Sequence, residues 1–598
     1  MELLLDASIS LTLHIGRTVG MGIQVRRIIL SAASTAAVAA AIFVASCTTS
    51  MESPSTMTPA ATCDPGNGGI TLSPGFCATV FADNLGHVRH AIVSDDGTLY
   101  VNIWSGRYYA GSPVPKDSFL VALKDGDKDG KAETITKFGV TGAQGAVGGS
   151  GIALYKNYVY AEANDQIVRY TIPAGQLTPA AGAVPEVIIS GLPTTGDHNM
   201  HPFVIDKSGN LFMDSGSASN SCQPQNRKAD IMGAVPCVEL ETRGGIWKYD
   251  ANKLNQVFSP KERYASGLRN AEGLAFDSSG RFFATMHGRD QLIQNWGKLY
   301  PDVNHTVELP SEELMEIKAG AKYGWPECYY DGFQKKLVLA PEYGGDGGKA
   351  VGICAQMTAP VAAYPAHWAP NDLEFSTSKT FPTAYQDGAF ITFHGSWNRS
   401  PGPQDGFNVA YQPMKNGKAS GEYIVFADGF TGGNNAKPVY RPMAVAASPD
   451  GSLYITDDNK GRIWRVTYTG PMNASLAGAP KPMSSAMPAP ATPATSTTAA
   501  MPAGVTAALI ANGDTVYHGS SCIACHGPDA KGTAVGPDLT DATWLTGDGS
   551  IGAITKIVSE GVDEPKQFRS PMPALGGANL SDDDLKAVSA YVWSISHK

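Results

Sequence analysis

The sequence predicts an all-β six-bladed β-propeller followed by a small all-α domain. Three observations support this fold class. The chain contains 66 Gly and 40 Pro, and only 17% of its residues are charged, which is typical of a loop-rich all-β protein. A β-hairpin pattern recurs across residues 62–469. Helical patterns are clearest in residues 505–598.

The recurring unit is a short apolar strand, a turn of Asp, Gly, Ser or Asn, and a second strand of alternating apolar residues. Copies begin at His90, Gly151, Pro202, Gly273 and Ala444, and a weaker sixth lies between Tyr364 and Phe393. Recurring hairpins predict a propeller, and six copies predict six blades, with seven as the alternative. Because a propeller closes on itself, its sites lie at the mouth of the central channel.

Two polar, low-complexity segments divide the chain. We expect a leader over residues 1–46, a tether over 47–61, the propeller over 62–469, a linker over 470–504 and the helical domain over 505–598. The linker is dominated by Pro, Ala, Ser and Thr and lacks apolar periodicity, so it is predicted to be extended and semi-rigid.

The N-terminus resembles an export signal. Arg26 and Arg27 precede an apolar run that ends in Val44-Ala45-Ser46-Cys47. A cysteine directly after small residues resembles a bacterial lipobox, which would make Cys47 a lipid anchor in the membrane. A plain signal peptide with a chance cysteine is the alternative. In both cases we expect the protein on the periplasmic side of a bacterial membrane, lipid-anchored or secreted to the periplasm.

The cysteine count agrees with export. Apart from Cys47 and two cysteines in the motif described next, six of the nine remain. Their closest sequence neighbours form the pairs Cys63–Cys77, Cys222–Cys237 and Cys328–Cys354. This pairing is preferred, although six cysteines permit other connectivities. Disulfides suit an oxidising compartment.

The segment Cys522-Ile-Ala-Cys525-His526 has the pattern of c-type haem attachment. The two thiols form thioethers to haem c, and His526 becomes an axial ligand of the iron. Met572 is the only methionine after the motif and is the expected second ligand, whereas His597 lies next to the end of the chain. A redox dithiol or half of a zinc site is the alternative, but a redox dithiol would need a βαβ surround and a zinc site would need more Cys or His nearby, and the sequence around the motif has neither.

The segment from Gly513 to the end resembles a class I cytochrome c. A helical pattern precedes the motif, Gly536-Pro537-Asp538-Leu539 follows it, and the methionine loop leads to a C-terminal helix. In this helix Ser581 is the expected N-cap, with acidic residues in the first turn. The sequence thus predicts a cytochrome c domain.

The propeller resembles the soluble quinoprotein sugar dehydrogenases, in particular their sorbosone-dehydrogenase-like branch. The resemblance is carried by residues 267–277 (GLRNAEGLAFD), 312–332 (EELMEIKAGAKYGWPECYYDG), 393–400 (FHGSWNRS) and 440–458 (YRPMAVAASPDGSLYITDD). The family binds pyrroloquinoline quinone (PQQ) with calcium on a six-bladed propeller. The resemblance therefore implies PQQ and calcium as cofactors here.

By position, the resemblance assigns catalytic roles to His198 and Arg269. His198 matches the histidine that removes the substrate hydroxyl proton, a task suited to imidazole near neutral pH. Arg269 and Asn270 match residues that hold the quinone oxygens of the cofactor, where a cation favours the negative charge that develops. Arg441 matches a partner of a cofactor carboxylate, and Arg399 is expected to act similarly.

The same alignment places the backbone carbonyls of Gly288 and Arg289 at the cofactor calcium. The sequence departs from the family at three positions. Ser217, 19 positions after His198, replaces an aspartate that supports the catalytic histidine, and Asp214 is the nearest carboxylate. Val439 replaces a second cofactor arginine, and Arg289 itself replaces a proline.

A separate acidic segment contains carboxylates at alternate positions and a turn glycine. The candidate calcium ligands are Asp125, Asp127, Asp129 and Glu133. The alternative is an acidic hairpin turn, because a full EF-hand places its glutamate further along. By family analogy, Glu313 and Tyr323 mark a further structural calcium site.

These features predict a periplasmic PQQ-dependent dehydrogenase that oxidises an aldose or related sugar or alcohol. Electrons would pass through its own haem to a downstream acceptor, such as a soluble cytochrome or a membrane oxidase. A non-enzymatic binding propeller fused to a cytochrome is the alternative, and a hydrolytic lactonase is a second one that has no use for a haem. The net charge of −10 is spread along the chain without a basic run, which argues against nucleic-acid binding.

Overall fold

The computed structural model describes residues 63–103, 118–139, 148–301, 307–399 and 402–476, and residues 502–597 apart from 503, 528–529, 534–535, 542, 564, 569–570 and 579. The expected leader over 1–46, Cys47, the tether and most of the linker lie outside the described residues. Among the residues that are described, no helix is long and apolar enough to cross a bilayer.

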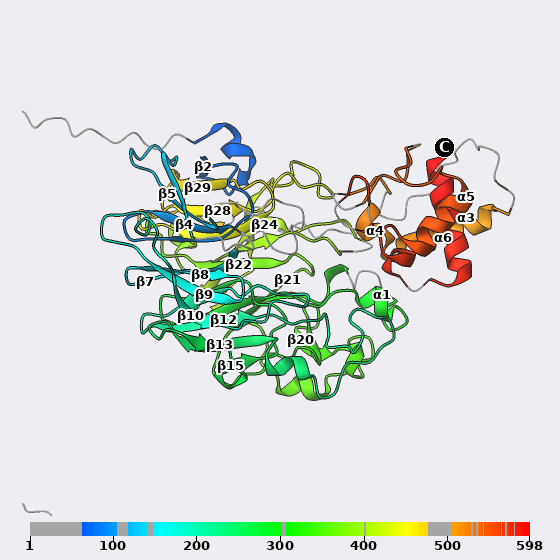
Figure 1. Cartoon of the computed structure of the whole chain (residues 1–598), viewed down its shortest axis with the longest axis horizontal. Coiled ribbons are helices and arrows are strands. Elements are labelled where there is room, and N and C mark those ends of the chain that lie inside the picture. The colour runs from blue at the N-terminus through cyan, green and yellow to red at the C-terminus, as the bar shows by residue number, and fades with distance from the viewer. Residues whose placement is uncertain are drawn as a thin grey trace, which may run out of the picture. The chain divides into compact units, whose positions relative to one another are not determined.

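In the part of the propeller that the structure describes, six sheets form the blades, and their strands are antiparallel apart from one edge strand (Figure 1). The first blade contains β3–β6, over Val88–Val93, Leu99–Ile103, Leu120–Lys124 and Thr134–Phe138. The second contains β7–β10 and, at its edge, the parallel strand β14, over Gly148–Tyr155, Tyr158–Ala163, Gln166–Thr171, Glu186–Ser190 and Gln256–Val257. The third contains β11, β12, β13 and β15, over Phe203–Ile205, Asn210–Ser215, Gly245–Asp250 and Arg263–Ser266.

The remaining blades follow the same order. The fourth contains β16, β17, β18 and β21, over Leu274–Phe276, Phe282–Met286, Glu312–Glu316 and Ala362–Tyr364. The fifth contains β22, β23, β24 and β26, with the short strands β25 and β1, over Pro370–Phe375, Gly388–His394, Phe407–Lys415, Ile424–Asp428, Lys418–Ala419 and Thr71–Leu72. The sixth contains β27, β28, β29 and β2, over Pro442–Ala447, Leu453–Asp457, Ile463–Tyr468 and Phe76–Ala82.

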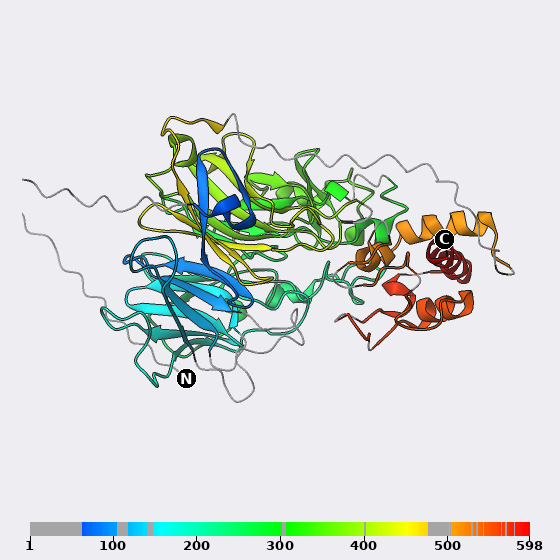
Figure 2. The same ribbon diagram turned by 90° about the horizontal axis from the view of Figure 1, so that it is seen from above.

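The ring of blades is closed by a pairing between segments far apart in the sequence. The N-terminal strand β2 pairs antiparallel with β29, and Phe76 lies opposite Tyr468. Figures 1 and 2 show these blue N-terminal strands beside the yellow strands of the last blade. The last sheet therefore contains strands from both ends of the propeller, which leaves no open gap between the first and last blades.

The innermost strands of the six blades are β3, β7, β11, β16, β22 and β27. Each contacts the next around the ring, and β27 contacts β3. These strands are the first strands of the six hairpins that the sequence predicts, so the six-bladed fold class is confirmed and the alternative of seven blades is wrong.

Apolar side chains from neighbouring blades form the cores between them. Phe212 of β12 packs against Phe282 of β17, with ring centroids 5.0 Å apart. Phe76, Phe381 and Phe426 form one aromatic cluster between the last two blades. Such close-packed interfaces hold the blades rigidly, which fixes the loops that connect them.

The three expected disulfides are present. Cys63–Cys77, Cys222–Cys237 and Cys328–Cys354 have Cα separations of 5.6, 6.0 and 5.8 Å. The second closes a long loop after β12. The third ties β19 (Cys328–Asp331), which pairs with β20 (Lys336–Leu339), to a later turn. The short helix α1 (Leu292–Trp296) lies in the loop after β17.

The C-terminal domain is helical, as predicted. Its helices are α3 (Ala507–His518), α4 (Cys522–His526), α5 (Ile551–Glu560) and α6 (Asp582–Ser596). Ser581 forms a capping box with Asp584 at the start of α6. Gly513 of α3 lies so close to α6 that an added Cβ would be 1.9 Å from the Ala587 carbonyl oxygen, so only glycine permits this helix crossing.

Candidate functional site

The predicted cofactor residues of the propeller lie in loops at one end of its blades. In an antiparallel blade, the loop that enters the first strand and the loop that leaves the second are at the same end. Entry loops supply His198 before β11, Arg269 and Asn270 before β16, and Arg441 before β27. Exit loops supply Ser217 after β12, Gly288 and Arg289 after β17, and Arg399 after β23. The fold thus gathers these residues from four blades.

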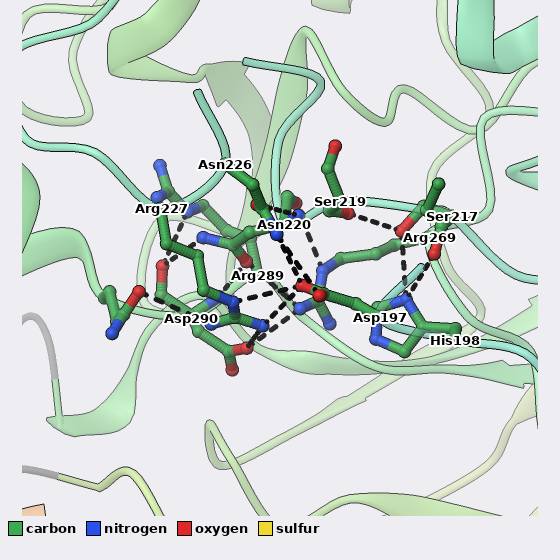
Figure 3. A network of polar contacts seen from close by, with 12 residues as sticks. Asp197, His198, Ser217, Ser219, Asn220, Asn226, Arg227, Arg269, Arg289 and Asp290 are labelled. Carbon is green, nitrogen blue, oxygen red and sulfur yellow. Dashed lines mark hydrogen bonds and ion pairs between the residues drawn. The ribbon is translucent and has the colours of Figure 1, made fainter. Parts of the chain in front are cut away.

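His198 is held by Ser217, as Figure 3 shows. Its Nδ1 atom lies 2.9 Å from the Ser217 carbonyl oxygen and 3.0 Å from Ser217 Oγ. Burial, with Arg269 and His287 nearby, lowers the pKa of His198 well below its usual value. The imidazole is therefore neutral at physiological pH, as a proton acceptor must be.

Asp214, the nearest carboxylate by sequence, does not take the place of the missing aspartate. It is fully buried on β12, and the hydrogen bonds of the His198 ring go to Ser217 instead. Burial and the neighbouring Glu272 raise the pKa of Asp214 well above its usual value. Asp214 is therefore part of the interior of the propeller and not a support for His198.

Replacing Asp214 with Asn should stabilise the protein at alkaline pH. Because the folded-state pKa of Asp214 is raised above the unfolded value of 3.8, the stability it contributes is lost as pH rises from the unfolded pKa towards the folded one. A neutral amide lacks this loss. We expect Asp214→Asn to raise Tm by roughly 2–5 °C at pH 8 and by almost nothing near pH 4, measured by calorimetry. The exposed Asp95→Asn is the control, and equal shifts in both variants at pH 8 would contradict the assignment.

Arg269 is buried and held on several sides. Its Nη2 atom lies 2.8 Å from Asp290 Oδ2, and its Nε donates to the Asn220 carbonyl oxygen over 3.2 Å. Its Nη1 donates to the Gly288 carbonyl oxygen over 2.9 Å. The predicted calcium ligand at Gly288 therefore already accepts a hydrogen bond from the predicted quinone-binding arginine.

Asp290 is the centre of this network and was missed from the sequence. Arg227 Nη2 lies 2.8 Å from Asp290 Oδ2, and Asn398 donates to Oδ1 of the same carboxylate. Burial alone would raise the pKa of Asp290, but Arg269 and Arg227 hold it well below its usual value. The only sequence signal was its place directly after Gly288 and Arg289.

Arg227 and His287 are further residues that the sequence did not identify. Arg227 lies in the loop closed by Cys222–Cys237 and donates to Asp197, beside His198, over 3.0 Å. The backbone N–H of His287 donates to the Asn270 carbonyl oxygen over 3.0 Å, and burial lowers the pKa of His287 to about 3. Both add to the positive and neutral polar groups around His198.

The other predicted arginines have partners in the protein. The Arg289 side chain lies 2.7 Å from the Glu342 carboxylate, and Arg399 pairs with Glu308. Arg441 donates to the carbonyl oxygens of His394 over 3.1 Å and Gly395 over 2.7 Å. Their proposed contacts with a cofactor remain predictions.

The predicted haem residues converge on one cavity of the helical domain. Cys522, Cys525, His526 and Met572 all line it, together with apolar side chains that include Trp544. His526 Nδ1 lies 3.0 Å from the Pro537 carbonyl oxygen, which can only accept a hydrogen bond. Nδ1 therefore carries the proton, and Nε2 is available as an iron ligand.

The cavity thus has what a covalently bound haem requires, namely two thiols, two axial ligands and an apolar lining. Pro537 explains why the segment after the motif matters, since its carbonyl orients the ring of His526. Backbone hydrogen bonds of 2.8 and 3.0 Å between Val562 and Met572 position the methionine loop.

The acidic loop between β5 and β6 gathers its four carboxylates. One ligand atom from each of Asp125, Asp127, Asp129 and Glu133 lies within 4.8 Å of the others. Backbone N–H groups also donate to these carboxylates, including that of Gly130 to Asp125 Oδ2 over 3.0 Å. The convergence of four carboxylate oxygens fits a small calcium loop, which stays a prediction with the acidic turn as its alternative.

Glu313 and Tyr323 have separate surroundings. The Tyr323 hydroxyl donates to the Glu316 carbonyl oxygen over 2.7 Å. Glu313 is buried on β18, and burial with the neighbouring Glu312 raises its pKa well above the usual value. The further calcium site at these residues remains a prediction.

Two family models match the chain. Residues 70–469 match the TrAA12-like family, and residues 510–596 match the cytochrome c family. An uncharacterized protein of Borreliella burgdorferi is 26% identical over 267 residues, which are 44% of this chain and 59% of that protein. A pyrroloquinoline quinone-dependent pyranose dehydrogenase of Coprinopsis cinerea is 26% identical over 239 residues, which are 34% of this chain and 31% of that protein. The chain thus covers less than two thirds of either relative.

Other matches concern the haem domain and the fold. The cbb3-type cytochrome c oxidase subunit FixP of Rhizobium etli is 34% identical over 80 residues, 13% of this chain and 27% of that protein. The Trichoderma reesei family AA12 structure with iodide has a TM-score of 0.54 at 17% identity and covers 67% of this chain and 98% of its own. The holo PQQ domain of the Coprinopsis cinerea pyranose dehydrogenase has a TM-score of 0.52 at 17% identity, covering 67% and 97%.

These matches agree with the predicted propeller of PQQ sugar-dehydrogenase type fused to a cytochrome c domain. The two solved structures support the propeller fold alone, because their identities are low. The TrAA12-like model, in contrast, matches well over half of the sequence. The chain therefore belongs to the TrAA12-like family.

Proposed function

We propose that this protein is a PQQ-dependent dehydrogenase that oxidises an aldose or related sugar or alcohol and transfers the electrons to its own haem. The observation that carries the proposal is the presence, in one chain, of a buried neutral base beside a guanidinium and of a complete haem pocket. A haem needs an electron source, and a dehydrogenase site on the propeller supplies one. The name of the Coprinopsis cinerea relative supports the same substrate class.

The residues around His198 fit an anionic quinone in charge and donor chemistry. Arg227, Arg269 and Arg441 supply guanidinium groups at one end of the propeller. The side-chain oxygen of Asn270 is buried without a hydrogen-bond partner among the described residues. Arg269 and Asn270 would hold PQQ, with Arg441 as a carboxylate partner. PQQ held there would supply the hydride acceptor for the reaction.

His198 would take the hydroxyl proton of the substrate as the hydride leaves. Its depressed pKa keeps the ring neutral and able to accept that proton. The guanidinium of Arg269 would stabilise the negative charge that develops beside it. A haem held by Cys522, Cys525, His526 and Met572 would supply a one-electron acceptor for the two electrons that each substrate releases.

The absorption spectrum of the holo-protein tests this function. The protein is incubated with PQQ and calcium, and spectra are recorded before and after a panel of aldoses is added. We expect the bands of reduced c-type haem only when both sugar and PQQ are present. A haem that stays oxidised, together with no binding of PQQ by calorimetry, would refute the dehydrogenase and favour a binding propeller with a cytochrome.

We further propose that the acidic loop binds calcium. Calcium should raise Tm by about 2–4 °C over a chelator in the wild type, by mass action on the folded state. In Asp127→Asn, which loses one ligand, we expect most of this gain to disappear, whereas the exposed Asp165→Asn should keep it. A full calcium response in Asp127→Asn would show that calcium binds elsewhere and that the loop is an acidic turn.

The cellular location is part of the same proposal. The predicted lipid anchor at Cys47 would hold the protein on the periplasmic side of the membrane, near a soluble cytochrome or an oxidase as acceptor. Cys47→Ser should release the protein from the membrane fraction into the periplasmic extract. Equal membrane retention of both forms would contradict the anchor.

A further inference from the structure

Ser217 surrounds one edge of the His198 ring with oxygen atoms. Its carbonyl oxygen lies 2.9 Å from His198 Nδ1 and also accepts the backbone N–H of His198 over 3.2 Å. Its Oγ atom lies 3.0 Å from the same Nδ1. Ser217 is itself fixed, since it is fully buried and its backbone N–H donates to the Arg269 carbonyl oxygen over 2.7 Å.

The protons of this contact can be assigned from the donors and acceptors. A carbonyl oxygen only accepts, so His198 Nδ1 must be the donor to Ser217. Ser217 Oγ donates its own hydrogen to the Ser219 carbonyl oxygen over 2.7 Å, which leaves a lone pair for Nδ1–H. In a neutral ring the other nitrogen, Nε2, then has no proton and is the basic atom.

The charges around His198 favour this neutral form. Burial is the largest cause of its lowered pKa, and the nearby Arg269, His287 and Arg227 lower it further. Arg243 donates to the backbone carbonyl oxygen of His198 over 2.9 Å. The neighbouring carboxylate Asp197 is paired with Arg227 at 3.0 Å. Neither oxygen that accepts from Nδ1–H carries a charge.

We propose that Ser217 is a positioning residue that fixes His198 in the tautomer with Nδ1 protonated and Nε2 free to accept the substrate proton. This inference rests on the proposed function for the role of Nε2, but the tautomer itself does not depend on catalysis. The carbonyl oxygen and Oγ of Ser217 are uncharged, and they orient His198 through hydrogen bonds alone. A carboxylate at the same place would orient the ring too, but it would also stabilise the protonated imidazolium. The base is thus oriented without a counter-charge.

Nitrogen NMR of the full holo-protein, labelled with 15N-histidine, tests the tautomer directly. The signals of His198 are identified by their loss in His198→Gln. We expect a neutral ring with Nδ1 protonated throughout pH 5 to 8. A ring protonated on Nε2, or one that carries both protons at pH 7, would overturn the inference even if the protein oxidises sugars.

Kinetics of three variants test the positioning role. Ser217→Ala keeps the carbonyl but removes Oγ, and we expect kcat to fall about threefold to tenfold with KM nearly unchanged. Ser217→Thr keeps the hydroxyl and should restore most of kcat. Ser217→Asp adds a carboxylate beside Nδ1, which favours the imidazolium and should move the acidic limb of the kcat–pH profile to higher pH.

The outcomes separate this inference from the proposed function. Unchanged kcat and pH profiles in Ser217→Ala and Ser217→Asp, with an unchanged far-UV circular dichroism spectrum of the β-rich propeller as a folding control, would overturn the role of Ser217. If no sugar is oxidised by the wild type, the proposed function fails, and the NMR spectrum still decides the tautomer.

Discussion

His198→Gln should abolish the sugar-dependent reduction of the haem. We expect kcat to fall about 10²- to 10⁴-fold, the range for loss of a general base. The amide is similar in size to the imidazole, and the backbone N–H of residue 198 still donates to the Ser217 carbonyl oxygen, so the loop should keep its position. It cannot accept a proton at neutral pH. Stopped-flow absorption of the haem after mixing with sugar measures the effect.

A matched substitution on the helical domain controls for nonspecific damage. His518→Gln changes a histidine of α3 that is far from His198 in the sequence and lines neither the propeller site nor the haem cavity. Haem reduction should proceed at the wild-type rate in this variant. Retention of more than a tenth of the wild-type kcat in His198→Gln, with PQQ still bound, would show that another group takes the proton.

Met572→Ala should remove the second axial ligand of the haem without releasing the haem. Cys522 and Cys525 still hold it covalently, and His526 still faces the same cavity. Because methionine ligation raises the reduction potential, we expect the potential to fall on the order of 0.1 V or more. The methionine-to-iron charge-transfer band should also disappear. Redox titration followed by absorption measures both changes.

His597→Ala is the control for this ligand assignment. His597 stacks on Trp593 at the end of α6, with ring centroids 4.9 Å apart, whereas Met572 lines the haem cavity. The potential and the band should therefore stay unchanged in His597→Ala. If the band is lost in His597→Ala and kept in Met572→Ala, the second axial ligand is His597 and not Met572.

The hairpin repeats of the propeller could be predicted from the sequence because each hairpin is specified by neighbouring residues. A polar turn between two apolar strands specifies a hairpin within about 15 residues, and all six predicted hairpins are the inner strand pairs of the blades. The outer strands are less regular in sequence. The pairing of β2 with β29 joins residues about 390 positions apart, which no local pattern specifies.

The haem site was also determined by the sequence, because its chemistry is local. The two thiols and the histidine of the haem motif lie within five residues, Cys522–His526, so they bind the same haem. The one methionine that follows the motif was then the candidate for the second iron ligand. The orientation of His526 by the Pro537 carbonyl, in contrast, became visible only when the loop was folded over the ring.

The propeller site also has a part that the sequence predicted and a part that only the tertiary structure decided. The sequence alone identified His198 and Arg269 through short segments that resemble a family. Only the tertiary structure showed that Ser217 and not Asp214 holds His198. It also showed that Asp290 contacts both Arg269 and Asn398, of which Asn398 lies 108 positions after Asp290. The reason is geometric, because loops from different blades meet at one end of a closed ring. The meeting of these loops decides which side chains form hydrogen bonds with one another, and the spacing of residues along the chain does not predict it.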